Sequence, residues 1–199
     1  MHKEAEISLI YEQVRDCKKC PLYKFAKNPV PGSGNLDTEI MFIGEGPGEK
    51  EDELGVPFVG RAGKLLDEML DSIGLKREDI YIANVVKHRP PGNRDPKPEE
   101  VVACWPYLQE QIRIIKPKLI VCLGRHSLGR FLPDIGPISQ VHGRAFKKKD
   151  QVFMALYHPA VGLYNGGMRE TLFEDFKKVK VALAKISNFK KQNSNNIQN

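Results

Sequence analysis

Four short segments of this 199-residue chain gather residue types that could do chemistry, and each follows an apolar run. Glycine, proline, histidine and charged residues recur among them. In proteins built of alternating strands and helices, ligands bind beyond the carboxyl ends of the strands, which is where these segments would fall. In chain order they read GEGPGEKED, NVVKHRPPGNRDP, LGRHS and YHPA. Their convergence predicts one site at one edge of a sheet.

The first segment places a carboxylate, Glu45, in a glycine-rich turn. Its alternating glycines, Gly44, Gly46 and Gly48, let the backbone turn sharply and approach a ligand closely. A dinucleotide-binding turn would open directly into a helix, and a P-loop would carry Gly-Lys-Ser or Gly-Lys-Thr. Pro47 and the acidic run behind it disfavour bound phosphate. The segment is therefore either a plain structural turn or a carboxylate held to position water or stabilise a cation.

Three further side chains are candidates for ligand contact, and each has a structural alternative. Phe58, in a loop bounded by glycine and proline, could stack on a planar ligand or pack in the core. Asn84 lies near a strand end, where asparagine is rare, so its amide either reads the edge of a base or caps its own backbone. His158 could hydrogen-bond a leaving group that gains negative charge, or it could hold local structure.

The chain has four cysteines, Cys17, Cys20, Cys104 and Cys122. The Cys17-x2-Cys20 spacing is typical of zinc and iron–sulfur sites. A thioredoxin-like pair would lie between a strand and a helix, whereas this pair precedes the first expected strand. Counting alone allows four thiolate ligands to one metal centre. Cys122, however, lies in the apolar run LIVCL and resembles an ordinary buried strand residue.

Strands and helices alternate along the chain, which predicts one α/β domain over residues 1–187 with a parallel sheet covered on both faces. The polar stretch 188–199 is predicted to be a disordered tail. The expected strands span residues 39–43, 79–86, 118–123 and 151–157. The expected helices span residues 4–15, 62–73, 98–115, 127–132 and 169–186.

The net charge of +6 favours a polyanion as partner, although many basic proteins bind no nucleic acid. The basic runs at 144–149 and 177–185 are either contact surfaces or solvated faces. No stretch approaches 18 consecutive apolar residues, and the N-terminus has no signal-peptide pattern. We therefore expect a cytoplasmic protein that makes no membrane contact, keeps its thiols reduced and acts as a monomer.

Five motifs, taken in order, resemble those of the family-4 uracil-DNA glycosylases, the thermostable iron–sulfur branch of the uracil-DNA glycosylase superfamily. The motifs are GEGPGEKED, PFVGRAG, NVVKHRPPGNRDP, VVACWPYLQEQI and HPA, and the likeness runs from about Cys17 to Phe176. The resemblance implies a three-layer α/β/α sandwich around a four-stranded parallel sheet. It also implies a base-excision-repair hydrolase that binds uracil-containing DNA, flips the uracil out, hydrolyses its N-glycosidic bond and leaves an abasic site.

The resemblance assigns the catalytic work to two residues. Glu45 would position water and stabilise the oxocarbenium-like sugar, and His158 would support the developing uracil anion. Gripping the DNA would fall to basic side chains, and a wedge residue would fill the vacated stack. The candidate contacts are Arg89, Arg94, Arg125 and Arg169 for phosphates, with Leu163 or Tyr164 as the wedge.

The resemblance also assigns the substrate pocket. Gly46 would keep the pocket floor open beside Pro47. Glu51 would lie near uracil C5 and reject the methyl group of thymine. Phe58 would stack on the flipped base, and Asn84 would read its polar edge.

A structural four-iron four-sulfur (4Fe-4S) cluster is implied as well, with one departure from the family pattern. The family's third ligand is a cysteine directly before Arg-Pro-Pro, where this chain has His88. The aligned ligand set is Cys17, Cys20, His88 and Cys104, and histidine is an iron–sulfur ligand in Rieske centres. A rival set replaces His88 by Cys122, and a degraded or zinc-filled site is a further alternative. The cluster would hold the N-terminal segment and the Arg-Pro-Pro loop against the domain.

Two other function classes stand beside the hydrolytic glycosylase. One is a uracil-DNA binding protein that forms a tight or covalent complex without turnover, as a relative with an inserted basic loop ending in a reactive histidine does. Here the loop at 90–96 is short, which favours turnover. The other is an iron–sulfur redox protein whose strand-end motifs are coincidental. Ala160, where the family often has serine, is a second and mild departure.

Overall fold

Six strands form one mixed sheet within residues 2–195, the part of the chain that this computed structural model describes, with side chains described through residue 186. The sheet order is β1-β3-β2-β4-β6-β5. The inner pairs are parallel, whereas β1 and β5 join antiparallel at the edges. The expected four-stranded parallel sheet is therefore confirmed as the core of a larger sheet. The strands are β1 Ser33–Gly34, β2 Ile40–Gly44, β3 Tyr81–Asn84, β4 Leu119–Leu123, β5 Arg144–Lys148 and β6 Gln151–Leu156.

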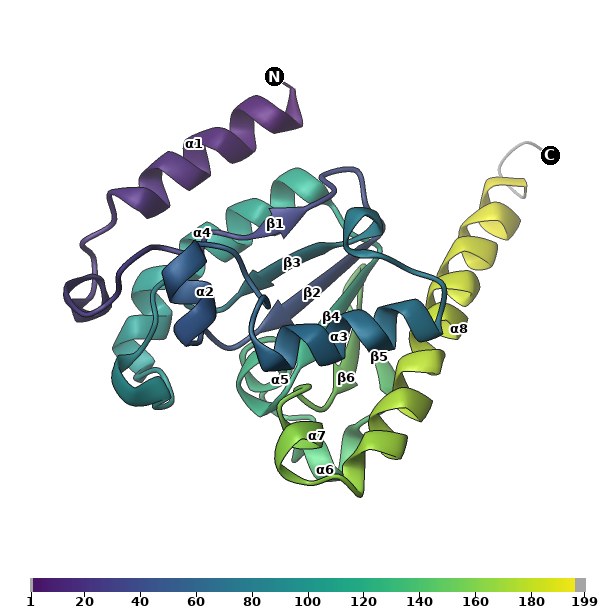
Figure 1. The fold of residues 1–199 in the computed structure, drawn as a ribbon. Coiled ribbons are helices and arrows are strands. Elements are labelled where there is room, and N and C mark those ends of the chain that lie inside the picture. Colours follow the sequence, from purple (N-terminus) through teal and green to yellow (C-terminus); the bar gives the residue numbers. More distant parts are fainter. Residues whose placement is uncertain (1, 196–199) are drawn as a thin grey trace.

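Helices cover both faces of the sheet, which gives the expected three layers (Figure 1). Helices α1 and α4 pack together on one face, and α3 and α8 pack on the other. Over the described part of the chain, none of these helices combines the length and the apolar character needed to cross a bilayer. The α-helices are α1 Lys3–Arg15, α2 Glu49–Leu54, α3 Arg61–Ser72, α4 Pro98–Ile115, α5 Arg125–Phe131, α6 Ile138–Val141, α7 Val161–Tyr164 and α8 Met168–Asn195, and the 3₁₀ helices are η1 Pro21–Lys24, η2 Arg77–Asp79 and η3 Pro91–Asn93.

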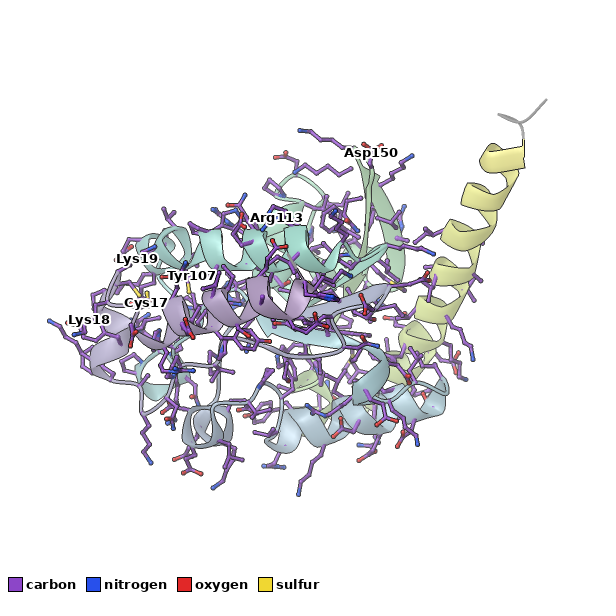
Figure 2. All side chains as sticks on the ribbon, turned by 90° about the horizontal axis from the view of Figure 1, so that it is seen from above. Cys17, Lys18, Lys19, Tyr107, Arg113 and Asp150 are labelled. Carbon is purple, nitrogen blue, oxygen red and sulfur yellow. The ribbon has the colours of Figure 1, made fainter. Side chains whose placement is uncertain are left out.

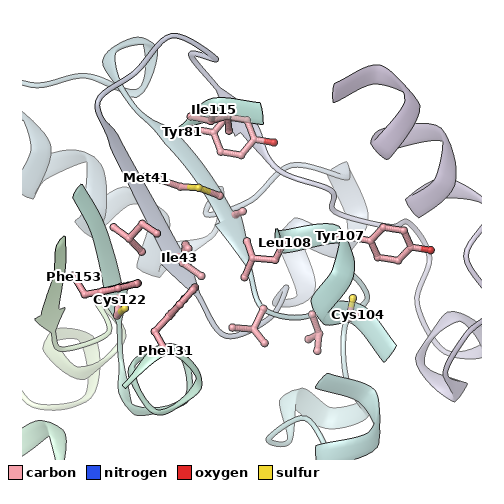
Figure 3. Packing of buried hydrophobic residues seen from close by; sticks show 14 of the residues in the cluster. Met41, Ile43, Tyr81, Cys104, Tyr107, Leu108, Ile115, Cys122, Phe131 and Phe153 are labelled. Atoms are coloured by element: carbon pink, nitrogen blue, oxygen red, sulfur yellow. The ribbon is translucent and has the colours of Figure 1, made fainter. Parts of the chain in front are cut away.

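The central strands contribute side chains to two separate cores, because successive side chains of a strand point to opposite faces of the sheet. On β2, Met41 and Ile43 belong to the core beneath α1 and α4, whereas Ile40 and Phe42 belong to the core beneath α3 and α8. Figure 3 shows the first core, to which Leu108 of α4 also contributes. Since β2 is buried on both faces, its sequence is a continuous apolar run, as parallel strands require.

Strand β5 is absent from the sequence expectations because its residues resemble a solvated charge cluster. Only Phe146 is partly buried, whereas Arg144, Ala145, Lys147 and Lys148 are exposed. The strand nevertheless pairs with β6 along its whole length. Lysines on an edge strand discourage further strand pairing, so the charged sequence suits this place in the sheet.

The last helix is longer than expected. Helix α8 reaches Asn195, although the tail is expected to begin at residue 188. Neither glycine nor proline occurs after Met168, and lysine and glutamine are good helix formers, so the helix continues past its last apolar residues. The stretch 188–195 is thus helical, and the final four residues of the expected tail lie outside the described residues.

Candidate active site

A cavity of about 540 Å³ opens at the carboxyl edge of the sheet, and all four strand-end segments contribute to its wall. Parallel strands bring their carboxyl ends to the same edge, which explains this convergence. All the residues assigned to catalysis or to the substrate pocket lie on this wall: Glu45, Gly46, Pro47, Glu51, Phe58, Asn84 and His158.

Glu45 follows the end of β2 between two glycines that leave no room for a side chain. A Cβ atom on Gly44 would lie 2.5 Å from Asn84 Oδ1, and one on Gly46 would lie 2.8 Å from the Val86 side chain. The Glu45 backbone oxygen accepts a hydrogen bond from Val86 N–H at 3.0 Å, which fixes the turn. The Glu45 side chain is 29% exposed. Because the fold holds this carboxyl partly away from water, burial raises its pKa.

Asn84, the last residue of β3, lines the cavity and carries an unsatisfied acceptor. Its side chain is buried, and its Oδ1 atom has no hydrogen-bond partner among the described residues. Lys87 Nζ donates hydrogen bonds to the Asn84 backbone oxygen at 2.9 Å and to Gln111 Oε1 at 2.7 Å, which fixes the strand end from behind. Leaving a buried polar atom unpaired costs about 1–3 kcal/mol, so the arrangement suits a ligand that donates to Oδ1.

Phe58 is held against the cavity in a strained backbone conformation. Its φ of 54° lies in the left-handed region, which side chains rarely adopt. The Arg77 guanidinium donates to the backbone oxygens of Pro57 and Phe58. The Phe58 ring stacks on the His158 ring with centroids 5.4 Å apart. The ring therefore has a fixed place in the wall, with Arg77 acting on it from outside the cavity.

Glu51 ties together the two loops that form one side of the cavity. Its Oε1 accepts the N–H groups of Val59 at 2.8 Å and Gly60 at 2.7 Å, and its Oε2 accepts Gly48 N–H at 3.1 Å. Glu51 thus lines the cavity, as expected, and also fixes the loop that carries Phe58.

His158 presents a neutral imidazole to the cavity. Its Nδ1 accepts a hydrogen bond from Ala160 N–H at 3.2 Å, which leaves Nε2 as the protonated ring nitrogen. Burial lowers the pKa of His158 to about 4. The ring therefore stays uncharged near neutral pH and offers a donor to the cavity.

Gly63 on α3 lies directly against the backbone of the Phe58 loop. A Cβ on Gly63 would overlap the Phe58 carbonyl group, whereas a Cβ on Gly129 of α5 would meet nothing within 4 Å. We expect Gly63→Ala to lower the free energy of unfolding by about 2–4 kcal/mol. The matched change Gly129→Ala should raise it by about 0.5–1 kcal/mol, since alanine favours helices. Denaturant melts of the two variants measure both values, and a Gly63→Ala loss of less than about 1 kcal/mol would contradict this packing.

Three of the four cysteines lie together on the α1–α4 side of the molecule. The Cys17 thiol and the Tyr107 hydroxyl interact, and Figure 2 shows the two side chains on this side of the molecule. Burial raises the pKa of the Cys104 thiol to about 11, with Lys87 opposing the rise and Cys20 and Cys17 adding to it. The Cys104 Sγ atom also accepts Lys87 N–H at 3.2 Å. The Cys17, Cys20 and Cys104 thiols are thus near enough to one another for their charges to interact.

The two candidates for a fourth ligand lie in different places. His88 is buried directly after Lys87, whose N–H contacts the Cys104 sulfur. Burial lowers the pKa of His88, opposed by the Asp52 carboxylate of α2. Cys122 lies on β4 in the middle of the core, and Figure 3 shows it apart from Cys104. Burial raises the pKa of Cys122 to about 12.

Three of the candidate DNA contacts line the cavity. Arg94 donates to the Glu100 carboxylate at 2.7 and 2.9 Å, and Arg125 pairs with Asp95 at 2.9 Å. Tyr164 is 87% exposed at the cavity mouth. Each arginine therefore already has a carboxylate partner that orients it.

The other three candidates, Arg89, Leu163 and Arg169, do not belong to the cavity wall. Arg89 donates to Asn93 Oδ1 at 2.8 Å, and Arg169 pairs with Glu68. Leu163 is half-buried against the core beneath α3 and α8. Of the two wedge candidates, Tyr164 is therefore the one that the fold leaves exposed beside the cavity.

Three contributors to the site are absent from the sequence expectations. Arg77 holds the Phe58 backbone, Asp95 lines the cavity, and His126 lies 3.7 Å from Glu45. Asp95 and His126 stand in two of the strand-end segments that mark the site, so their position was a usable signal. Arg77 lies in no such segment, and nothing in its sequence context indicates its contact.

Comparisons with known proteins give matches over most of this chain. A family model described as the uracil DNA glycosylase superfamily matches residues 31–183. The chain is 51% identical to the type-4 uracil-DNA glycosylase of Sulfurisphaera tokodaii over 180 residues, which cover 86% of this chain and 82% of that one. It is 50% identical to the Archaeoglobus fulgidus type-4 enzyme, covering 85% and 89% of the two chains. It is 44% identical to the Thermotoga maritima type-4 enzyme, covering 92% and 97%.

Proposed function

Because this chain belongs to the uracil-DNA glycosylase superfamily, and within it to the type-4 enzymes, it is a DNA-repair glycosylase, and we propose how its cavity recognises uracil and cuts the glycosidic bond. The base must leave the helix stack before any side chain can reach that bond. A cavity of about 540 Å³ has room for one flipped pyrimidine.

Recognition of uracil combines stacking with a polar reading of the base edge. The flipped ring lies against Phe58, and Asn84 Oδ1, unpaired and buried, accepts the uracil N3–H. Gly46 and Pro47 form the floor, and the loop tied by Glu51 closes the side where thymine carries its methyl group. Thymine is excluded by shape, and cytosine is excluded because its N3 has no hydrogen to donate.

Cleavage depends on charge placed at both ends of the breaking bond. Glu45 orients a water molecule and stabilises the positive charge that develops on the sugar. The neutral His158 ring donates its Nε2–H to the uracil oxygen that gains negative charge. The water oxygen bonds to the sugar carbon and gives up one proton to solvent as the bond to uracil breaks, and the released uracil anion takes a proton from solvent. The product is an abasic site.

Contact with the DNA backbone falls to the basic groups around the cavity mouth. Arg125 and Arg94 approach phosphates, and the exposed Tyr164 enters the space that the flipped nucleotide vacates. The net charge of +6 supports this interaction. We propose that the enzyme acts as a monomer.

The observation that carries this function most directly is the unpaired, buried Oδ1 of Asn84 in a cavity shared with Glu45 and a neutral His158. An oligonucleotide with a single uracil, beside thymine and cytosine controls, tests it on a denaturing gel after alkali treatment. Hydrolysis gives an alkali-dependent break at uracil alone. A slow-moving protein–DNA adduct would instead support a covalent binder. An intact strand would contradict the glycosylase mechanism and favour the iron–sulfur redox protein.

The thiol set fits an iron–sulfur cluster. Three cysteines with interacting charges lie together, and the Cys104 sulfur already accepts a backbone N–H, a contact common around cluster thiolates. Cys17, Cys20, Cys104 and His88 would hold a 4Fe-4S cluster. The bound cluster would supply cross-links between the loop after α1, the Arg-Pro-Pro loop and α4. In this proposal it supports the fold and takes no part in base excision.

The ligand set can be read from iron content. We expect wild-type protein and Cys122→Ala to carry about four irons per chain, and Cys104→Ala to lose most of them. His88→Ala should lose iron, whereas His88→Cys should keep it and lower the reduction potential, because histidine ligation raises it. Iron assay and redox titration measure these outcomes. Full iron in His88→Ala with loss in Cys122→Ala would assign the fourth ligand to Cys122 instead.

A further inference from the structure

A histidine outside the cavity wall contacts the carboxylate on which the proposed reaction depends. His126, in the first turn of α5, lies with its Nε2 atom 3.7 Å from Glu45 Oε2. The same Nε2 atom lies 3.1 Å from Asp95 Oδ2, on the loop before α4. The facing atoms of the three side chains lie within 4.8 Å of one another. Segments after β2, β3 and β4 thus meet at this point.

The His126 Nε2 atom faces one hydrogen-bond donor and two acceptors. Arg125 Nε donates toward it at 3.0 Å, which a neutral ring nitrogen can accept. The Asp95 and Glu45 carboxylates, on the other side, can only accept, so a hydrogen bond from this nitrogen to Asp95 needs a hydrogen on it. Arg125 also pairs with Asp95 at 2.9 Å. The Asp95 carboxylate thus contacts both His126 and Arg125, and it holds the two side chains beside Glu45.

We propose that His126 is a positioning residue for uracil excision, which holds the Glu45 carboxylate in place beside the cavity while Asp95, itself paired with Arg125, fixes the His126 ring. The proposal rests on the role of Glu45 in the proposed function. It adds to that role a residue that does not line the cavity and does not touch the substrate.

The charges around Glu45 give the direction of the effect. Burial raises the pKa of Glu45, His126 opposes this rise most strongly, Asp95 adds to it, and Arg125 opposes it. Without the cation at position 126, Glu45 takes up a proton at higher pH. Since only the carboxylate can stabilise a cationic sugar, activity would then be lost earlier as the pH falls. The other charged or titratable groups on the cavity wall are Arg94, Glu51, His158 and Tyr164.

The charge of His158 does not change within the pH range of the test. Burial lowers its pKa to about 4, so between pH 5 and pH 8 the ring remains neutral in wild type and variant alike. Arginine keeps its charge throughout this range. The three backbone hydrogen bonds that Glu51 accepts do not involve His126. A moved acid limb therefore reports on Glu45.

The test is the pH profile of single-turnover excision with enzyme in excess over a uracil oligonucleotide. We expect His126→Gln to move the acid limb upward by about 0.5–1 pH unit, which lowers the rate three- to tenfold at pH 5 and little at pH 8. His126→Lys, which restores a cation, should keep the wild-type limb. His2→Gln, at a histidine whose side chain is 96% exposed, is the matched control. Uracil-DNA affinity at pH 8 should be unchanged in all three variants.

An unmoved acid limb in His126→Gln, or the same upward shift in His126→Lys, would overturn the proposal. Glu45→Gln measured alongside separates this failure from failure of the proposed function. If Glu45→Gln is inactive while the His126→Gln limb is unmoved, only the role of His126 is wrong. If Glu45→Gln excises uracil at the wild-type rate, the role of Glu45 fails first, and that of His126 with it.

Discussion

Replacement of Glu45 by glutamine should lower the single-turnover rate of uracil excision by about 100- to 1,000-fold, while uracil-DNA affinity changes little. Glutamine keeps the size and the hydrogen-bonding reach of the side chain but removes its negative charge. That charge is needed only when positive charge builds up on the sugar, so its loss weakens the transition state rather than the bound substrate. Rapid-quench kinetics give the rate, and fluorescence titration at the same pH gives the affinity.

Glu49→Gln is the matched control, because Glu49 is an exposed glutamate four residues away that does not line the cavity. Both variants lose one negative charge, so any general effect of net charge on DNA binding appears in both. We expect Glu49→Gln to excise at the wild-type rate. A Glu45→Gln rate within about tenfold of wild type would contradict the proposed chemistry, since removal of one transition-state contact typically costs more.

Much of the fold was predictable because strands buried on both faces have continuous apolar sequences. The runs that became β2 and β4 carry this signal, and so do their glycine- and proline-rich endings. Strand β5 was not predicted because its stability comes from pairing with β6, not from its own apolar content. The end of α8 escaped for a related reason: a helix can continue on propensity after its apolar face has ended.

Some residues of the site are marked by their place in the sequence, whereas others reach the site only through the tertiary fold. Asn84 and Glu45 stand at strand ends, where the fold class itself predicts a site, and resemblance to a known family gives their expected roles. Arg77 lies 19 residues from Phe58 along the chain, and only the folded structure brings its guanidinium to the Phe58 carbonyl. His126 belongs to a segment that was marked, but its importance depends on its distance to Glu45. Residues that support other residues are therefore the part of the site that sequence reasoning misses.

The buried network behind Asn84 joins the base-reading edge to the thiol set. Lys87 donates through its side chain to the Asn84 backbone oxygen and through its backbone to the Cys104 sulfur. Gln111 extends this network, since its Nε2 donates to Pro31 O at 2.7 Å and to the Tyr81 hydroxyl at 3.1 Å. A metal cluster that fixes Cys104 would thereby help to fix the strand end that carries Asn84. This gives a structural cluster a physical route to influence recognition without taking part in the reaction.

Asn84→Ala should lower kcat/KM for uracil excision by about 100-fold or more, because the substrate N3–H would then enter a buried site without an acceptor. The same change should leave the melting temperature almost unchanged. Among the residues that the structure describes, the buried Oδ1 has no partner, so its removal relieves a cost that offsets the packing lost with the side chain. Steady-state kinetics and thermal melts of the same preparation measure both effects.

Asn35→Ala provides the comparison for a structural asparagine. Its exposed side chain accepts a hydrogen bond from Asp37 N–H at 2.8 Å, away from the cavity, so its loss should cost a little stability and no activity. Two outcomes separate the interpretations of Asn84. Full activity in Asn84→Ala would show that its amide does not read the base. A melting temperature lowered by several degrees, with activity reduced only in proportion to unfolding, would make Asn84 a fold residue. Inactive but stable protein is the result that an acceptor reserved for the substrate requires.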